Sequence, residues 1–138
     1  MAANNDPIYS RTGAIGLNTG ITSAQNTYDG AGANDTLVFS ADATNGSYVQ
    51  RLRFKAKGTN VASVARIYIN NGSTNGTAAN NTFYGEISLP ATTAAAAAAT
   101  VDIDYPLNLP LPAGYKIYVG LGTAVAAGWV VTTVAGHY

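Results

Sequence analysis

The sequence contains no cysteine among its 138 residues. This absence excludes disulfide bonds, thiolate nucleophiles and cysteine-ligated metal sites. Histidine is almost as scarce, because the one histidine, His137, stands next to the last residue. Zinc sites need several histidine, cysteine or carboxylate ligands, and a catalytic triad needs a histidine held in rigid surroundings. We therefore interpret His137 as a polar residue near a chain end, and we expect no cofactor.

Charge is also scarce. Only 10% of the residues are charged, and the seven basic side chains cancel the seven acidic ones, whereas about a quarter of the residues of a soluble domain are usually charged. A balanced chain produces no long-range field that attracts nucleic acid, so we expect no nucleic-acid partner. Low charge also reduces repulsion between copies, which favours a protein that packs against neighbours.

Long hydrophobic runs are missing as well. The alanine run 94–99 is too short to cross a membrane, and Gly120, Gly122 and Gly128 interrupt the uncharged stretch 117–138. The opening residues, MAANNDPIYSRTG, lack the basic start and apolar run of a secretory signal. We expect no membrane partner and synthesis in a cytoplasm.

The chain instead has the pattern of short strands. From residue 36 onward, runs rich in β-branched and aromatic residues alternate with turn signals such as Asn45-Gly46 and Asn71-Gly72. The predicted strands cover residues 36–41, 48–57, 61–70, 82–89, 100–107, 115–121 and 128–138. No helical periodicity is sustained anywhere. We therefore expect an all-β fold, a two-sheet antiparallel β-sandwich of jelly-roll-like form.

Alternation within these strands also assigns side chains to faces. It places Tyr48 with Leu52, and Phe83 with Ile87, on sides that face the core. Proline cannot donate a hydrogen bond to a neighbouring strand, so the prolines of residues 106–112 predict an edge strand or a crossover between sheets.

Residues 1–35 differ from the rest. Glycine and asparagine interrupt every period, and the few apolar residues are widely spaced. Such a segment cannot bury much apolar surface by itself. We therefore divide the chain into an extended N-terminal arm, residues 1–35, and a β-sandwich domain, residues 36–138. The arm is either flexible or lies on another surface, and its candidate partner contacts are Ile8, Tyr9, Arg11, Ile15 and Leu17.

The sharpest charged feature is a basic row on the predicted strand 48–57. Four cations share one face over about 20 Å, and all four are candidate partner contacts: Arg51, Arg53, Lys55 and Lys57. The row is consistent with a solvated edge strand protected from aggregation. It is equally consistent with ion pairing to Asp102 and Asp104, on a neighbouring strand or across a subunit interface. Binding to a phosphate backbone ranks below both interpretations.

No motif points to catalysis. Asp102 and Asp104 alternate on one strand face, whereas the two carboxyl groups of a glycosidase lie on opposite sides of the scissile bond. A calcium site needs more oxygen ligands than this pair supplies. We therefore expect a protein that is not an enzyme and that has no metal site.

The aromatic residues leave two interpretations open. The sequence has nine tyrosines and one tryptophan, Trp129. Such side chains stack on sugars or anchor interfaces, and they are equally common in sandwich cores. Trp129 is a candidate partner contact. Its burial between sheets would favour a structural role, and its exposure in a concave patch would favour sugar binding.

The chain resembles small virion proteins of tailed bacteriophages. The resemblance rests on the absent cysteine, the surface rich in Asn, Thr, Gly and Ala, and the glycine-broken N-terminal segment. The stretches VDIDYPLNLPLPAGYKIYVGLGT and GWVVTTVAGHY are also similar to strands of phage head-decoration and fibre-associated domains.

This resemblance implies a jelly-roll capsid decoration (cement) protein without catalytic residues. Such a protein would be made in the host cytoplasm and reside on the capsid exterior of the virion. It would bind the major capsid protein as a homotrimer and clamp the joints between capsid subunits, with its N-terminal arm along the shell. The alternative is a carbohydrate- or receptor-binding module of a phage fibre or capsid exterior, with a host glycan as partner.

Overall fold

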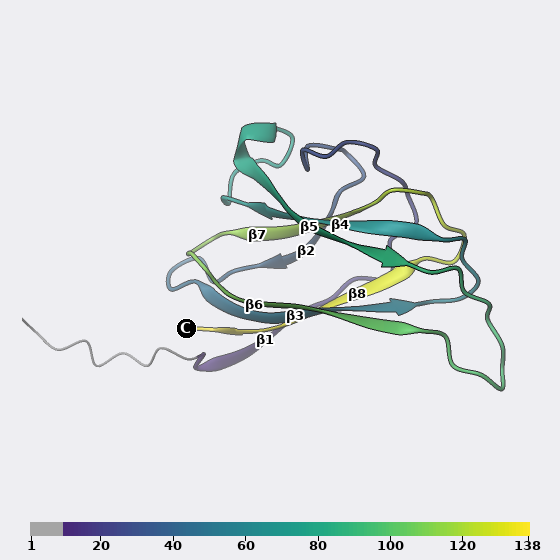
Figure 1. The fold of residues 1–138 in the computed structure, drawn as a ribbon. Coiled ribbons are helices and arrows are strands. Elements are labelled where there is room, and N and C mark those ends of the chain that lie inside the picture. The colour runs from purple at the N-terminus through teal and green to yellow at the C-terminus, as the bar shows by residue number, and fades with distance from the viewer. Residues whose placement is uncertain (1–9) are drawn as a thin grey trace, which may run out of the picture.

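A computed structural model describes residues 10–138 of the chain, so the predicted contacts Ile8 and Tyr9 lie outside the described residues. The described part consists of eight strands and one short 3-10 helix (Figure 1). The elements are β1 (Thr12–Gly16), β2 (Thr36–Ser40), β3 (Ser47–Ala56), β4 (Ser63–Asn70), η1 (Ala78–Asn80), β5 (Asn81–Leu89), β6 (Asp102–Leu111), β7 (Lys116–Leu121) and β8 (Trp129–His137).

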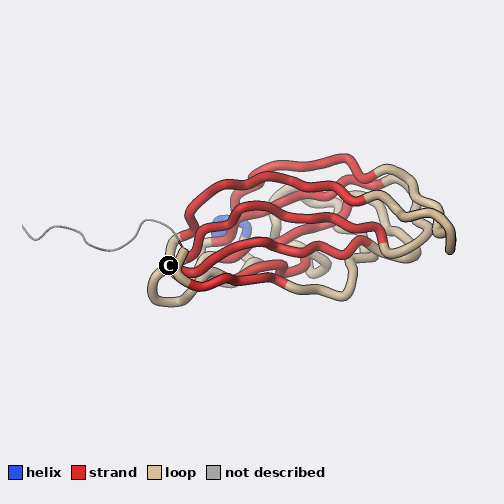
Figure 2. Tube along the Cα trace, turned by 90° about the horizontal axis from the view of Figure 1, so that it is seen from below, coloured by secondary structure: helices blue, strands red, loops and turns tan. Residues whose placement is uncertain are grey.

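The strands form two antiparallel sheets of four strands each. Sheet A has the order β1-β8-β3-β6, and sheet B has the order β2-β7-β4-β5. The sheets are the two stacked layers of Figure 1, and Figure 2 shows their strands running along the length of the molecule with loops at both ends. The predicted all-β sandwich is confirmed.

The pairing is that of one long hairpin rolled into two layers. β1 pairs with β8, β2 with β7, β3 with β6, and β4 with β5. The first half of the chain therefore runs back along the second half, and the β4–β5 connection forms the tip. Rolling this hairpin distributes the strands over two sheets in the jelly-roll order, which the sequence pattern led us to expect.

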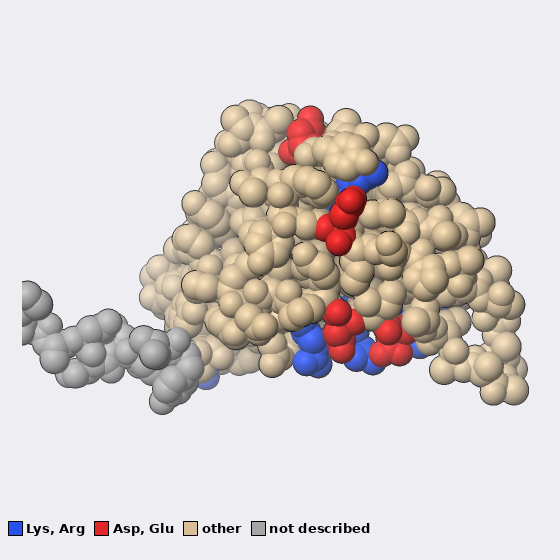
Figure 3. Space-filling model, in the orientation of Figure 1, with Lys and Arg blue, Asp and Glu red and all other residues tan. Residues whose placement is uncertain are grey.

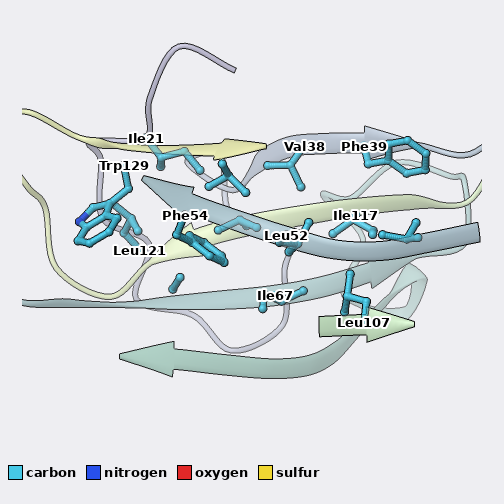
Figure 4. Packing of buried hydrophobic residues seen from close by; sticks show 14 of the residues in the cluster. Ile21, Val38, Phe39, Leu52, Phe54, Ile67, Leu107, Ile117, Leu121 and Trp129 are labelled. Carbon is cyan, nitrogen blue, oxygen red and sulfur yellow. The ribbon is translucent and has the colours of Figure 1, made fainter. Parts of the chain in front are cut away.

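The core lies between the two sheets and consists of aliphatic and aromatic side chains (Figure 4). Along most strands these buried residues alternate with more exposed ones. Trp129, Phe54 and Leu52 from sheet A pack there with Ile67 and Ile117 from sheet B, and all five are fully buried. Complete burial of a side chain of this size stabilises the fold by about 1.5–3 kcal/mol. The inward face of each sheet therefore supplies most of the driving force for folding.

Two β-bulges change the faces that strict alternation assigns. In β3 the register against β8 shifts around Gln50, so Val49 is buried and Tyr48 turns to the outer face. In β5 the register shifts around Tyr84, so Phe83 turns to the outer face of sheet B. A bulge adds one residue to a strand and thereby reverses the alternation beyond it. The predicted core-facing positions of Tyr48 and Phe83 were therefore wrong.

β6 contains Pro106 and Pro110 and is the edge strand of sheet A opposite β1. This position confirms the prediction of an edge, because a strand with prolines can pair through one side only. Asn108 between them has a φ of 48°. This left-handed residue lies where the β3–β6 register is irregular.

Residues 10–35 belong to the sandwich and do not form a separate arm. β1 pairs with β8 over its whole length. Further along, Ile21 exchanges backbone hydrogen bonds with Trp129 at 2.8 and 3.1 Å, and the Gln25 N–H donates to the Leu121 carbonyl at 2.7 Å. The predicted boundary at residue 35 is therefore wrong within the described residues. Backbone pairing at a sheet edge holds this segment, and such pairing leaves no hydrophobic period in the sequence.

Candidate functional site

The basic row on β3 is paired with acidic residues of the neighbouring strand. β3 lies between β8 and β6, so it is a central strand, and the edge-strand interpretation was wrong. Arg51 Nε lies 3.6 Å and Arg53 Nη1 lies 3.3 Å from one carboxylate oxygen of Asp104, and Arg53 Nη2 also pairs with Asp102. The interpretation as ion pairing to a neighbouring strand is confirmed. Exposed pairs of this kind each stabilise a fold by at most about 1 kcal/mol.

The two lysines of the row bind backbone carbonyl groups. Lys55 Nζ donates to the carbonyl of Thr100, and Lys57 Nζ donates to the carbonyl of Thr19 at 3.0 Å. Each lysine thereby fastens a loop to the end of β3. The four cations of the row are consequently engaged in local contacts on the outer face of sheet A. They do not form a line of unpaired charges that a partner could bind.

Trp129 is the first residue of β8 and is fully buried between the sheets (Figure 4). A side chain without exposed surface cannot contact a partner, so its assignment as a partner contact was wrong. Burial also removes Trp129 from the argument for a sugar site. Its contribution is to the core, where it packs beside Ile21 and Leu121.

The remaining predicted contacts of the N-terminal segment lie on or beside β1. The Arg11 N–H donates to the His137 carbonyl at 2.8 Å, and its side chain is exposed. Ile15 is 63% exposed and Leu17 is 79% exposed. Single exposed apolar side chains are ordinary on a protein surface, but several that lie together mark a surface that another molecule can cover.

Ile15 and Leu17 line one side of a groove between the open edges of the two sheets. β1 is the outermost strand of sheet A and β2 is the outermost strand of sheet B. The groove has a volume of about 340 Å³, and its other side includes Leu37, which is exposed, and Phe39. The two edges touch at Gly16, where a Cβ atom would lie 2.1 Å from the Val38 carbonyl oxygen. We call Ile15, Leu17 and Leu37 the edge patch.

His137 lies at one end of this groove and is held by contacts on two sides. Its Nδ1 is 2.6 Å from Ser47 Oγ, and its ring stacks on Phe39 with centroids 6.1 Å apart. Ser47 is fully buried, and its hydroxyl also accepts the Asp42 N–H at 2.9 Å. A serine so enclosed cannot reach a substrate, so the pair works as a tie between β8 and β3.

A second cluster lies on the outer face of sheet B, where residues 22–35 form a loop that crosses β4. We call this segment the cover loop. Arg66, on β4, is buried beneath it and donates to the Gln25 carbonyl at 2.9 Å and to the Tyr28 hydroxyl at 3.0 Å. Its guanidinium carbon also lies 4.0 Å from the centroid of the Tyr28 ring. Glu86, on β5, is 3.8 Å from Arg66 Nε and balances its charge.

Two further buried groups hold the cover loop in place, one on β4 and one at the end of the loop itself. The Tyr68 hydroxyl donates to the Thr27 carbonyl at 2.9 Å, and burial raises the pKa of Tyr68 to about 12. Asp35 accepts the Gly32 N–H at 3.0 Å, and burial raises the pKa of its carboxyl group above the ordinary value. Gly30 lies against the ring of Tyr68 so closely that a Cβ atom would be 2.9 Å away. The loop is therefore packed onto the sheet.

Sequence reasoning did not single out Arg66. The usable signal is a lone arginine inside the apolar run SVARIYIN, because a charge at such a position is buried only when it has partners. Its partners Gln25 and Tyr28 lie about forty positions earlier in the chain. Because the partners are so far apart in the sequence, the cluster forms only when the chain folds, and no local pattern indicates it.

Within residues 10–138, no group of three histidine or acidic side chains is arranged to hold a metal ion. The same residues contain no helix of the length and apolar character that crossing a membrane requires. No family model, curated protein or solved structure matches this chain.

Proposed function

We propose that this domain is a structural virion protein that binds the outside of a tailed-phage capsid. In this proposal it associates as a homotrimer, is made in the host cytoplasm and stabilises contacts between major capsid subunits. Its work is done by surfaces and not by catalysis, and neither nucleic acid nor a membrane is a partner. The proposal extends the resemblance of the sequence to phage decoration proteins.

The edge patch is the observation that carries the proposal. Ile15, Leu17 and Leu37 are all exposed, and they come together where both sheets end. Burying apolar surface yields about 25 cal/mol for each Å² removed from water, so covering these side chains favours association. Each copy that binds the assembled shell also shifts the equilibrium away from the open lattice by mass action.

The backbone of β1 adds a second source of affinity. One side of β1 pairs with β8, and its other side carries N–H and C=O groups that no strand within residues 10–138 pairs with in sheet A. An extended segment of a capsid subunit, or of a neighbouring copy, can add to such an edge through main-chain hydrogen bonds. The apolar groove beside the edge would then select the side chains of that segment.

The surface charge also suits a shell-bound protein. Most charged side chains on the face seen in Figure 3 gather in a narrow band that crosses both layers, and most of the remainder of that face is uncharged. The arginines of β3 are already paired with Asp102 and Asp104. Apolar contact should therefore dominate binding, which makes the affinity insensitive to salt.

The fold by itself supports a structural role and a sugar-binding role equally. Jelly rolls occur in viral capsid domains and in lectins, and a fold does not determine a function. The tryptophan that motivated a sugar site is buried. The edge patch consequently gives the structural role more support than the sequence alone did.

Co-sedimentation with empty, expanded phage heads assembled without this protein tests the proposal. We expect saturable binding of the wild-type chain, and loss of binding for Leu17→Asp and for Ile15→Asp. Val61→Asp is the matched control, because Val61 is 58% exposed but lies outside the groove. Failure of the wild-type chain to bind heads, or equal binding by all four proteins, would contradict the proposal.

A further inference from the structure

Two aromatic rings on the outer face of sheet B remain exposed although the neighbouring Tyr68 is buried. Tyr28 is 58% exposed and Phe83 is 40% exposed. Their centroids are 5.6 Å apart with the ring planes at 80°, and Phe83 is also 5.6 Å from Tyr68. The bulge at Tyr84 turns Phe83 to this face, where it joins a ring from the cover loop. Bulges occur where a side chain must be re-aimed.

The Tyr28 ring is held in place before any ligand arrives. Arg66 is buried, donates to the Tyr28 hydroxyl at 3.0 Å and occupies one face of the ring. The loop backbone beside the ring is also fixed, because Asn81 Nδ2 donates to the Asp29 carbonyl at 3.1 Å and Asn75 Nδ2 donates to the Gly30 carbonyl at 3.3 Å. A ring fixed in this way loses little conformational entropy when a ligand stacks on it.

The charges around the two rings restrict the ligand. Asp29 is fully exposed and follows Tyr28 in the chain, and a hydrogen bond from the Ala31 N–H lowers the pKa of its carboxyl group. Glu86, on β5, adds a second exposed carboxylate, 3.8 Å from Arg66 Nε. These carboxylates repel phosphate, sulfate and carboxylate ligands. A cation on the exposed ring surface would be repelled by the guanidinium of Arg66 across the ring.

A neutral sugar meets all of these conditions. The C–H face of a hexopyranose stacks on aromatic rings, and its hydroxyl groups donate hydrogen bonds to carboxylates. We infer that Tyr28 and Phe83 form a binding site for a neutral hexose polymer, with Asp29 and Glu86 as the acceptors for its hydroxyl groups. We call these four residues the Tyr28 site. Arg66 acts as its positioning residue.

The Tyr28 site goes beyond the proposed structural role and lies apart from the surface that carries that role. The edge patch lies along β1 and β2, whereas the Tyr28 site is formed by the cover loop and β5 on the outer face of sheet B, the upper layer of Figure 1. A shell-bound protein could therefore expose the sugar site to the surroundings. Either function can fail without the other.

Titration calorimetry with soluble dextran, galactomannan, chitooligosaccharide and galactan tests the inference, with dextran sulfate and choline as charged probes. We expect the full chain to bind at least one neutral polymer and neither charged probe. Tyr28→Ala and Phe83→Ala should each weaken that binding by about three- to tenfold. Tyr48→Ala, which removes a tyrosine from the outer face of sheet A, should leave it unchanged.

Tyr28→Phe separates stacking from positioning, because it keeps the ring and removes the hydroxyl that accepts from Arg66. We expect it to retain most of the affinity that Tyr28→Ala loses. Circular dichroism confirms that each variant is folded, and head binding by Tyr28→Ala should equal that of the wild-type chain. A flat response to every neutral polymer, a preference for dextran sulfate or choline, or equal affinity of Tyr28→Ala and the wild-type chain would overturn the inference.

Discussion

The guanidinium carbon of Arg66 lies 4.0 Å from the centroid of the Tyr28 ring. The contact joins β4 to a loop residue that lies 38 positions earlier in the chain. This contact, with the hydrogen bond from Arg66 to the Gln25 carbonyl, fixes the cover loop on sheet B. A buried arginine costs free energy unless its donors are satisfied, and the loop supplies acceptors for Nη1 and Nη2. The loop and the arginine therefore stabilise each other.

Replacement of Arg66 should loosen the cover loop. Arg66→Met keeps the apolar volume but removes the hydrogen bonds to Gln25 and Tyr28, so we expect a loss of about 2 kcal/mol in the free energy of unfolding. Arg53→Met removes exposed ion pairs instead and should cost less than about 1 kcal/mol. Urea denaturation measures both losses. Faster amide hydrogen exchange within residues 22–35 should accompany the first variant only, and equal losses with no change in exchange would contradict this role for Arg66.

Asp35 should make the free energy of unfolding depend on pH. Burial raises the pKa of its carboxyl group in the folded state above the ordinary value of 3.8, which the unfolded chain retains. Between those two pKa values the unfolded chain has already released the proton, so the contribution of Asp35 to stability falls as pH rises through that window. Asp35→Asn removes this penalty and retains an acceptor for the Gly32 N–H. The free energy of unfolding of Asp35→Asn, relative to that of the wild-type chain, should therefore increase from pH 3 to pH 7.

Asp42→Asn provides the comparison of opposite sign. The Asp42 carboxylate accepts the N–H groups of Asn45 and Thr44, which lower its pKa. Its contribution to stability is present above the unfolded pKa and is lost as pH falls, so this variant should become less stable relative to the wild-type chain as pH rises. Urea unfolding at several pH values measures both differences. If the differences for Asp35→Asn and Asp42→Asn changed with pH in the same direction, the raised pKa assigned to Asp35 would be wrong.

The single tryptophan reports directly on the core. Because Trp129 is the only tryptophan and is fully buried, its fluorescence should have a short-wavelength maximum and should resist quenching by acrylamide. Addition of a neutral polysaccharide or of empty heads should leave the emission unchanged. A large spectral shift on addition of either one would place Trp129 at a binding surface and contradict its burial.

The edge patch should also control self-association. We expect sedimentation equilibrium to give the mass of three chains for the wild-type protein, and the mass of one chain for the double variant Ile15→Asp/Leu17→Asp. Introducing two carboxylates into an apolar contact removes its driving force and adds repulsion between copies. Val61→Asp should retain the wild-type mass. A monomeric wild-type protein at high concentration would remove the trimer from the proposal.

Much of the fold could be predicted from the sequence, and the exceptions have local causes. Alternation and turn residues identified the seven strands from β2 to β8. Strict alternation failed at Gln50 and Tyr84, because a bulge is decided by pairing across strands and leaves little trace in one strand. β1 was missed because TGAIG is short, and glycine contributes no side chain to a hydrophobic period.

The candidate surfaces were less predictable than the fold. Ile15 and Leu17 could be selected because they are large apolar residues in a polar segment. The partners of Arg53 required the register of β3 against β6, for which the two spaced aspartates gave a usable hint. The contact of Arg66 with Tyr28 had no such hint, since it depends on the path of the cover loop over β4.

A cryo-electron microscopy reconstruction of empty heads saturated with this protein tests the structural proposal most directly. We predict ordered density for three jelly-roll copies around each occupied axis on the outside of the shell. In each copy the edge patch should be buried against the capsid or a neighbouring copy, with the Tyr28 site facing away from the shell. The proposal would be contradicted by heads without added density, or by bound copies whose Ile15 and Leu17 face solvent.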